Sequence, residues 1–251
     1  MRDEWIKKAA VGIMRGQLRR WLRVQRRYFR LRPPIGMVRF GSLRRIRPIS
    51  DVFGSDRGTC IDRYYIESFL RRQSPDIHGK VLEIGSDEYT RRYGGDRVTC
   101  AEVLHAVAGN PVATLVGDLA TGQGIPKGAF DCLIVTQTLQ FIYEVQAAIG
   151  NCYSALKAGG VLLGTFPGIS QISRYDMERW GEYWRFTDES ARRLFGVVFG
   201  VENVTIETHG NVLVACAYLQ GFAAQELKPA ELNYHDSDYQ VLITVRAVVP
   251  Y

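Results

Sequence analysis

Short runs of apolar, often β-branched residues recur along the chain from Gly79 onward, and segments with a helical spacing of apolar positions lie between them. Such runs are typical of strands that are buried on both faces of a parallel sheet. The alternation predicts an α/β fold, a doubly wound sheet with helices on both faces. The seven predicted strands are residues 81–84, 98–103, 113–116, 132–136, 161–165, 204–208 and 241–248.

Three helices are predicted around these strands, over residues 61–72, 145–156 and 211–227. Asn211 is expected to cap the last of them, because a short polar side chain can accept hydrogen bonds from the free amides of a first helical turn. The run Lys157-Ala158-Gly159-Gly160 is expected to end the second helix. Glycine readily adopts the left-handed conformation of a helix C-terminus, and lysine favours the negative end of the helix dipole.

The first 47 residues follow a different pattern. Apolar side chains such as Trp5, Ile13 and Trp21 recur at steps of three and four with arginines between them, until Pro33-Pro34 interrupts the helical pattern. This segment holds 15 of the 32 Lys and Arg residues but only two of the 26 Asp and Glu residues, so its charge of +13 leaves −7 for the remainder. The sequence therefore predicts a basic amphipathic arm, residues 1–47, before one globular domain, residues 48–251.

The arm has three candidate partners. A basic amphipathic helix within residues 1–32 is typical of binding to an anionic membrane surface, where arginines pair with phosphate groups. The helix could instead pack on the domain, or on a second copy of the chain in a homodimer. Nucleic acid is the least favoured partner, because the acidic remainder of the chain would repel a long polyanion.

Cysteines and apolar runs bear on the cellular location. The five cysteines are scattered and odd in number, which argues against a disulfide framework or a zinc site. No apolar run is long enough for a membrane span, and the arginine-rich start is unlike a signal peptide. We therefore expect a cytoplasmic protein that the arm could hold at the inner membrane.

The motifs VLEIG at 81–85, GDL at 117–119, FDCLIV at 130–135 and LKAGGVLL at 156–163 follow one another at a characteristic spacing. In order and spacing they resemble the class I S-adenosylmethionine (SAM)-dependent methyltransferases. Four further motifs, PIS at 48–50, GSDRG at 54–58, IDRYYIE at 61–67 and WGEYWRFT at 180–187, resemble methyltransferases encoded among glycosyltransferases in bacterial glycan clusters. The resemblance implies a Rossmann-like, seven-stranded sheet with an antiparallel last strand.

The resemblance also implies that SAM is the cofactor. Ligands of open α/β sheets bind beyond the carboxyl ends of the strands, which is where the matching residues fall. The implied cofactor-binding residues are Glu83 and Gly85 in the first loop, Glu102 at the ribose hydroxyls, Asp118 and Leu119 at the adenine, and Thr136 and Gln137 at the methionine moiety.

The first loop departs from the family pattern Gly-x-Gly-x-Gly. After Gly85 the chain reads Ser86-Asp87-Glu88-Tyr89, so Asp87 and Tyr89 stand where the second and third glycines would be. Side chains at these positions hinder the close approach of the cofactor tail. Ser86 and Asp87 are candidate cofactor ligands, since Asp87 could face the ammonium group of SAM. Alternatively, Asp87 and Tyr89 fill the pocket, and the protein is a non-catalytic binding or scaffold protein.

An insertion between the fifth and sixth predicted strands, residues 168–199, is rich in aromatic side chains. Aromatic faces beside an acid and a guanidinium suit a carbohydrate phosphate or a nucleotide-linked sugar, although such a cluster could also be a small core under a lid. The helix that precedes the sheet contributes two further candidates. The candidate substrate residues are Arg63, Tyr64, Tyr175, Trp180, Tyr183, Trp184 and Arg185.

Methyl transfer to a sugar hydroxyl requires a group that accepts the hydroxyl proton. Asp176 in the insertion and His209 after the sixth strand are the candidates, although His209 could equally be a buried, hydrogen-bonded residue. The other histidines lack ligand spacing, so no metal site is expected. The predicted function is a SAM-dependent O-methyltransferase acting on a glycan, or on a lipid-linked or nucleotide-linked sugar. A scaffold protein and a nucleic-acid methyltransferase are the alternatives.

Overall fold

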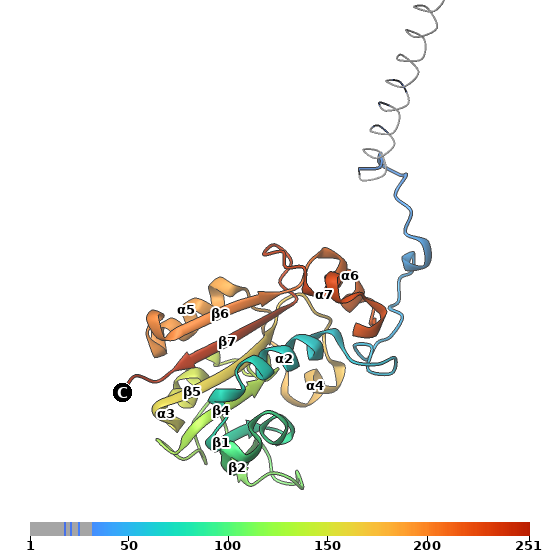
Figure 1. Cartoon of the computed structure of the whole chain (residues 1–251). Helices are drawn as coiled ribbons and strands as arrows, with labels where there is room; N and C mark the ends of the chain where they lie inside the picture. Colours follow the sequence, from blue (N-terminus) through green and yellow to red (C-terminus); the bar gives the residue numbers. More distant parts are fainter. Residues whose placement is uncertain (1–17, 19–20, 22–24, 26–31) are drawn as a thin grey trace, which may run out of the picture. The chain divides into compact units, whose positions relative to one another are not determined.

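The computed structural model of the chain describes residues 18, 21, 25 and 32–251 (Figure 1). Its strands are β1(Gly79–Ile84), β2(Val98–His105), β3(Leu115–Val116), β4(Phe130–Thr136), β5(Leu156–Pro167), β6(Val204–His209) and β7(Leu242–Val248). Its α-helices are α2(Ile61–Arg72), α3(Val145–Ala155), α4(Arg174–Trp180), α5(Asp188–Phe199), α6(Val212–Leu219) and α7(Pro229–Asn233). Short helical turns are η1(Gly41–Leu43), η2(Ser74–Asp76), η3(Thr90–Gly94), η4(Gly95–Arg97), η5(Leu139–Phe141), η6(Val201–Asn203) and η7(Ala224–Glu226).

The strands form one sheet in the order β3-β2-β1-β4-β5-β7-β6, which confirms the predicted Rossmann-like α/β fold. Strands β1 to β5 pair in parallel, whereas β7 lies antiparallel between β5 and β6, as the resemblance implied. The sequence order reverses between β1 and β4, which are adjacent in the sheet. In open sheets such a switch point is where a ligand binds.

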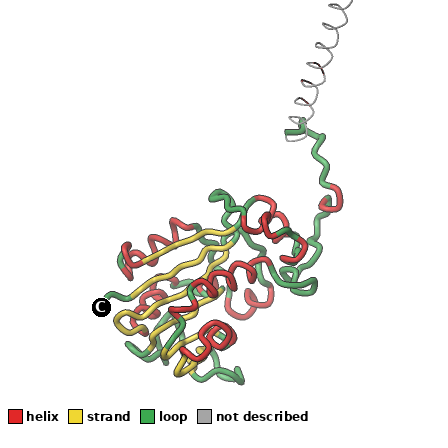
Figure 2. The backbone as a smooth tube through the Cα atoms, in the orientation of Figure 1, coloured by secondary structure: helices red, strands yellow, loops and turns green. Residues whose placement is uncertain are grey.

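Helices cover both faces of this sheet because alternate residues of the central strands are buried on opposite sides (Figures 1 and 2). Leu82, Leu133 and Leu162 pack on the side of α3 and α5. Val81 and Ile134 pack on the other side, with α2 and α6. Because the sheet is buried on both faces, the open ends of its strands are the natural place for a ligand site.

Two predicted helix ends were wrong. Helix α3 ends at Ala155, and Lys157 to Gly160 belong to β5 rather than to a helix C-terminus. Leu156 already pairs with β4, and Gly159, at φ +74°, donates its amide to the Val249 carbonyl at 2.9 Å. The left-handed conformation of Gly159 therefore belongs to the irregular first part of strand β5 and not to a helix C-terminus.

Helix α6 ends at Leu219, not at residue 227. The next turn contains Gly221 at φ +71°, where a Cβ atom would lie 2.2 Å from the Ser50 carbonyl oxygen. The helix ends here in a Schellman motif, in which Gly221 donates to the Tyr218 carbonyl and Phe222 to the Ala217 carbonyl, each at 3.0 Å. The cap at Asn211 is confirmed, since its side chain accepts the Val214 amide at 3.1 Å.

The chain divides into two compact units, Met1–Ile46 and Arg47–Tyr251. The basic amphipathic helix predicted within residues 1–32 lies outside the described residues, apart from isolated positions. The described end of the first unit is mostly irregular, with the single turn η1 and with Ile35, Met37 and Phe40 exposed. No helix among the described residues is both long and apolar enough to cross a membrane.

Candidate functional site

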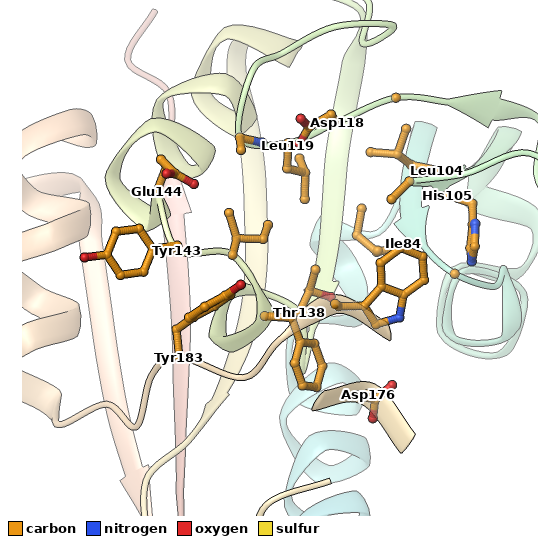
Figure 3. Close-up of a pocket in the computed structure, with 17 residues that line it drawn as sticks. Ile84, Leu104, His105, Asp118, Leu119, Thr138, Tyr143, Glu144, Asp176 and Tyr183 are labelled. Atoms are coloured by element: carbon orange, nitrogen blue, oxygen red, sulfur yellow. Dashed lines mark hydrogen bonds between the residues drawn. The ribbon is translucent and has the colours of Figure 1, made fainter. Parts of the chain in front are cut away.

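A cavity of about 470 Å³ opens at the carboxyl ends of β1 and β2, beside the switch point of the sheet (Figure 3). We call it the first cavity. Ile84, Leu104 and Leu119 give it apolar walls, and Phe141 and Ile142 extend them. Figure 3 shows Asp118 and Leu119 across the cavity from Asp176 and Tyr183. An apolar cavity with a few polar groups at its rim is the usual form of a small-molecule site.

Gly85 lines this cavity directly after β1. It has φ +83°, and a Cβ atom built there would have no neighbour within 4 Å. The first value is a conformation that glycine adopts without strain. The second means that the space beside Gly85 is open. Gly85, a predicted cofactor residue, therefore lies at an open part of the cavity wall.

Glu83, another predicted cofactor residue, does not line the first cavity. Its carboxylate is buried and accepts the Thr90 amide and hydroxyl at 2.7 and 2.8 Å, and the Tyr89 amide and Ser86 hydroxyl at 3.3 Å. Burial raises the pKa of the Glu83 carboxyl, against the lowering effect of these hydrogen bonds. Glu83 thus fixes the turn that follows Gly85.

The two residues that replace family glycines also lie outside the lining of the first cavity. Asp87 pairs with Arg91 at 2.5 Å, one helical turn away. Tyr89 is buried among α2 and η3, stacks on Tyr93, and its hydroxyl accepts a hydrogen bond from Arg63. Ser86 is likewise turned to Glu83. The side chains that could have filled the pocket are therefore held by partners elsewhere.

At β2, Glu102, the predicted ribose ligand, does not line the first cavity. Glu102 lies within the strand, opposite Leu82, and is 3.4 Å from the Lys80 ammonium. A hydrogen bond from Thr114 and the contact with Lys80 lower the pKa of its carboxyl. The strand continues to His105, and it is Leu104, His105 and Ala106 that line the cavity. These three residues were not predicted, because the strand was expected to end at residue 103.

Asp118 and Leu119 line the first cavity as predicted. The Asp118 carboxylate accepts the Ala120 amide at 2.8 Å and the Thr121 hydroxyl at 3.1 Å, so it also shapes its own turn. Gly124 in this turn has φ +74°. A Cβ atom built on it would lie only 2.2 Å from the Val116 carbonyl oxygen, so the two backbone segments are in close contact. This close contact holds the turn against the end of β3.

A second cavity of about 340 Å³ adjoins the first, and Phe141 and Asp176 line both. Its other walls come from the start of α2, the residues after β4 and the segment after β5. Gln137 lies in it with φ +47°, an unusual conformation for a residue with a side chain. Non-glycine residues held in this region often mark functional sites. Thr136, the other predicted methionine contact, lines neither cavity. Gln137 lines the second cavity, and Thr138 lines the first.

The segment between β5 and α5 contributes only some of its aromatic residues. Trp180 and Tyr183 line the first cavity, and the Trp180 ring meets the His105 ring edge-on at 5.9 Å. Tyr175 is exposed and lies under the Arg179 guanidinium. Trp180 and His105 thus connect α4 to the end of β2 along one side of the cavity.

Trp184 and Arg185 have structural partners instead of a place in either cavity. The Trp184 indole donates to the Ile142 carbonyl at 3.0 Å and stacks on Tyr143. Arg185 pairs with Glu182 at 2.7 Å. These two residues support the predicted alternative, a small core under a lid. In the α2 helix, Arg63 lines the second cavity, whereas Tyr64 lines neither.

His209 lies apart from both cavities. Its ring stacks on Tyr65 with centroids 5.3 Å apart, and its Nε2 is 3.1 Å from the Thr244 hydroxyl. Burial, followed by the nearby charges of Arg72 and His235, lowers its pKa to about 4. This half-buried, hydrogen-bonded position favours the alternative interpretation of His209, whereas Asp176, the other candidate proton acceptor, lines both cavities.

Residues 98–164 match the family model described as "Methyltransferase domain". A SAM-dependent methyltransferase from Archaeoglobus fulgidus is similar in structure, with a TM-score of 0.49, 13% identity, and coverage of 74% of this chain and 94% of that one. The N-methyltransferase NodS from Bradyrhizobium japonicum WM9, solved with S-adenosyl-L-homocysteine (SAH), has a TM-score of 0.49, 14% identity, and coverage of 80% and 94%. No curated protein sequence matches the chain.

Proposed function

We propose that this chain, a class I SAM-dependent methyltransferase, methylates a sugar hydroxyl of a glycan or of a lipid-linked or nucleotide-linked sugar. The family match over residues 98–164 and the order of the sheet give the enzyme class and its cofactor. The observation that supports the acceptor class is the second cavity, whose walls carry amide, hydroxyl and carboxyl side chains beside the first cavity. Such groups match the hydrogen-bonding needs of a polyol.

The residues of the first cavity fit the proposed cofactor. Gly85 leaves open space at the turn after β1, and the apolar walls from Ile84, Leu104 and Leu119 suit a flat purine ring. Asp118 and His105 would lie at its polar edges. Asp87 and Tyr89, which could have blocked the cofactor, are paired with Arg91 and Arg63. These pairings count against the scaffold alternative.

Asp176 is the residue we propose as the acceptor of the hydroxyl proton. It lines both cavities, and its carboxylate accepts the Ser173 hydroxyl at 2.6 Å, which orients it. When bound, SAM supplies a methyl carbon whose bond to sulfur breaks as its bond to the acceptor oxygen forms. Asp176 would hold the proton released from that oxygen, and the walls of the second cavity would orient the acceptor.

Calorimetric titration of SAM and SAH tests the cofactor site directly. We expect both to bind, and Asp118→Ala to weaken binding.

For the proton acceptor, Asp176→Asn should lower kcat by about 100-fold or more, the usual range for general bases, while SAH affinity changes little. Transfer of radiolabelled methyl from SAM to methyl glycosides and nucleotide sugars measures kcat. His209→Gln is the matched control and should leave kcat unchanged; equal losses in both variants would contradict the assignment.

The arm is proposed to hold the enzyme at an anionic membrane surface, on the cytoplasmic side of the inner membrane. Exposed Ile35, Met37, Phe40 and Ile46 alternate with arginines in its described part, a combination that suits a headgroup layer. A homodimer contact and nucleic-acid binding are the alternatives carried from the sequence.

Vesicle co-sedimentation distinguishes these partners. We expect the full chain to sediment with vesicles of anionic phospholipid but not with neutral ones, and deletion of residues 1–32 to remove most of this binding. Unchanged sedimentation after the deletion would contradict the proposal. Steeply salt-dependent RNA or DNA binding that the deletion removes would favour the nucleic-acid alternative.

A further inference from the structure

Gln140, one of the residues in the lining of the second cavity, has a buried side-chain oxygen. Gln140 is 3% exposed, and its amide nitrogen donates to the Gln137 side-chain oxygen at 3.1 Å. Its own Oε1 has no hydrogen-bond partner among the described residues. Leaving a buried acceptor without a donor costs free energy, so such an atom in a cavity wall points to a ligand that donates a hydrogen bond.

Two carboxylates face the same cavity. Asp62, at the start of α2, accepts the Arg63 amide at 2.8 Å, and Tyr218 lines the same cavity. Burial raises the pKa of the Asp62 carboxyl. Asp176 lies on another wall, and both residues retain further acceptor capacity because a carboxylate can accept several hydrogen bonds. Ligand groups that donate hydrogen bonds are therefore favoured from more than one side.

The remaining charges of the second cavity do not offset these carboxylates. Glu182 is neutralised by Arg185 at 2.7 Å. Arg63 is the one basic residue in the described lining, and it already donates to the Tyr89 hydroxyl and lies over the Tyr89 ring. A dianionic phosphate in this cavity would face Asp62 and Asp176 with a single guanidinium as counter-charge.

We propose that the second cavity binds the acceptor as an uncharged, hydroxyl-rich ring and discriminates against phosphorylated forms of that ring. Gln140, Asp62 and Asp176 are its hydrogen-bond acceptors. This inference rests on the proposed function and narrows it, because a phosphate of a nucleotide-linked or lipid-linked sugar would have to lie outside this cavity. Only the ring that carries the methylated hydroxyl enters.

The test is an NMR titration of the full chain saturated with SAH, using methyl α-D-glucopyranoside and glucose 1-phosphate as probes. We expect the glycoside to bind at least about 10-fold more tightly than the phosphate, which corresponds to about 1.4 kcal/mol. Gln140→Met keeps the length and volume of the side chain and removes the unpaired oxygen. It should weaken glycoside binding about 10-fold. Because it also removes the amide that donates to Gln137, thermal unfolding of the variant is measured as well, and its SAH affinity should stay unchanged. Asp62→Asn should reduce the difference in affinity between the glycoside and glucose 1-phosphate.

Glu189→Gln is the matched control, because Glu189 is an exposed acid in the first turn of α5, as Asp62 is an acid in the first turn of α2. It should change neither probe's affinity. Equal or tighter binding of glucose 1-phosphate, no glycoside binding to the SAH-loaded protein, or unchanged glycoside affinity in Gln140→Met would each overturn the inference. Failure of SAH itself to bind would instead contradict the proposed function, so the two failures are distinguishable.

Discussion

Replacing Gly85 by valine is expected to reduce SAH affinity by about 100-fold or more while the protein stays folded. The substitution places a branched side chain where the first cavity now has open space, since no atom lies within 4 Å of a Cβ built at Gly85. The left-handed φ of +83° adds strain of about 1–3 kcal/mol for a β-branched residue. Isothermal titration with SAH and thermal unfolding measure the two effects separately.

Gly95→Val is the matched control for this experiment. Gly95 has φ +54°, and a Cβ built there also has no neighbour within 4 Å. It follows η3 and lies outside the lining of the first cavity. Similar losses of stability in both variants, with SAH affinity lost only in Gly85→Val, would identify the cavity as the cofactor site. A comparable loss of affinity in Gly95→Val would mean that strain, not occupancy, explains the result.

The fold was predictable because its signals are repeated along the chain. Each central strand is a run of apolar residues that is buried on both sides, so seven short runs were enough to give the sheet. Asn211 could be identified because a cap depends on one side chain and the next turn. The end of α6 was predicted too late because apolar residues continue after Gly221, whereas the helix ends at this glycine in a Schellman motif closed by the Gly221 and Phe222 amides.

The site was only partly predictable, for a related reason. Gly85, Asp118 and Leu119 follow short strands, and all three line the first cavity. Glu102 does not line it, because β2 continues to His105, and an apolar pattern does not show where a strand with polar residues ends. Gln140 had no distinguishing signal in the sequence. Its importance comes from a side-chain oxygen that the fold buries without a donor.

The structure explains how Asp87 and Tyr89 are accommodated where the family has glycines in the first loop, which the sequence did not reveal. Asp87 and Tyr89 were expected to point toward the cofactor tail because that is where the family has no side chains. In the structure the turn after Gly85 enters the helical segment at η3, so Asp87 faces Arg91 and Tyr89 packs toward α2. The Arg63 contact with Tyr89 then links this turn to a wall of the second cavity.

That arrangement depends on Glu83, so Glu83→Ala is expected to destabilise the protein by about 3 kcal/mol or more. The substitution leaves the Thr90 amide and hydroxyl and the Tyr89 amide without their buried acceptor, and each such loss costs about 1–3 kcal/mol. SAH affinity should fall as well, because the turn that holds Gly85 open is no longer fixed. Urea unfolding and SAH titration measure these changes.

The stability difference between wild type and Glu83→Ala is also expected to depend on pH, in a direction set by the pKa of Glu83. Because burial raises the pKa of the folded-state carboxyl above its ordinary value of 4.5, wild-type stability from this group is fully present below pH 4.5 and declines as the pH rises through the folded-state pKa. The stability difference between wild type and Glu83→Ala should therefore narrow over that interval. Glu88→Ala, in the same turn but exposed, is the control and should change stability by less than about 0.5 kcal/mol. If Glu83→Ala destabilised the protein as little as Glu88→Ala, the turn would not depend on the Glu83 carboxylate. The position of Tyr89 away from the first cavity would then need another cause.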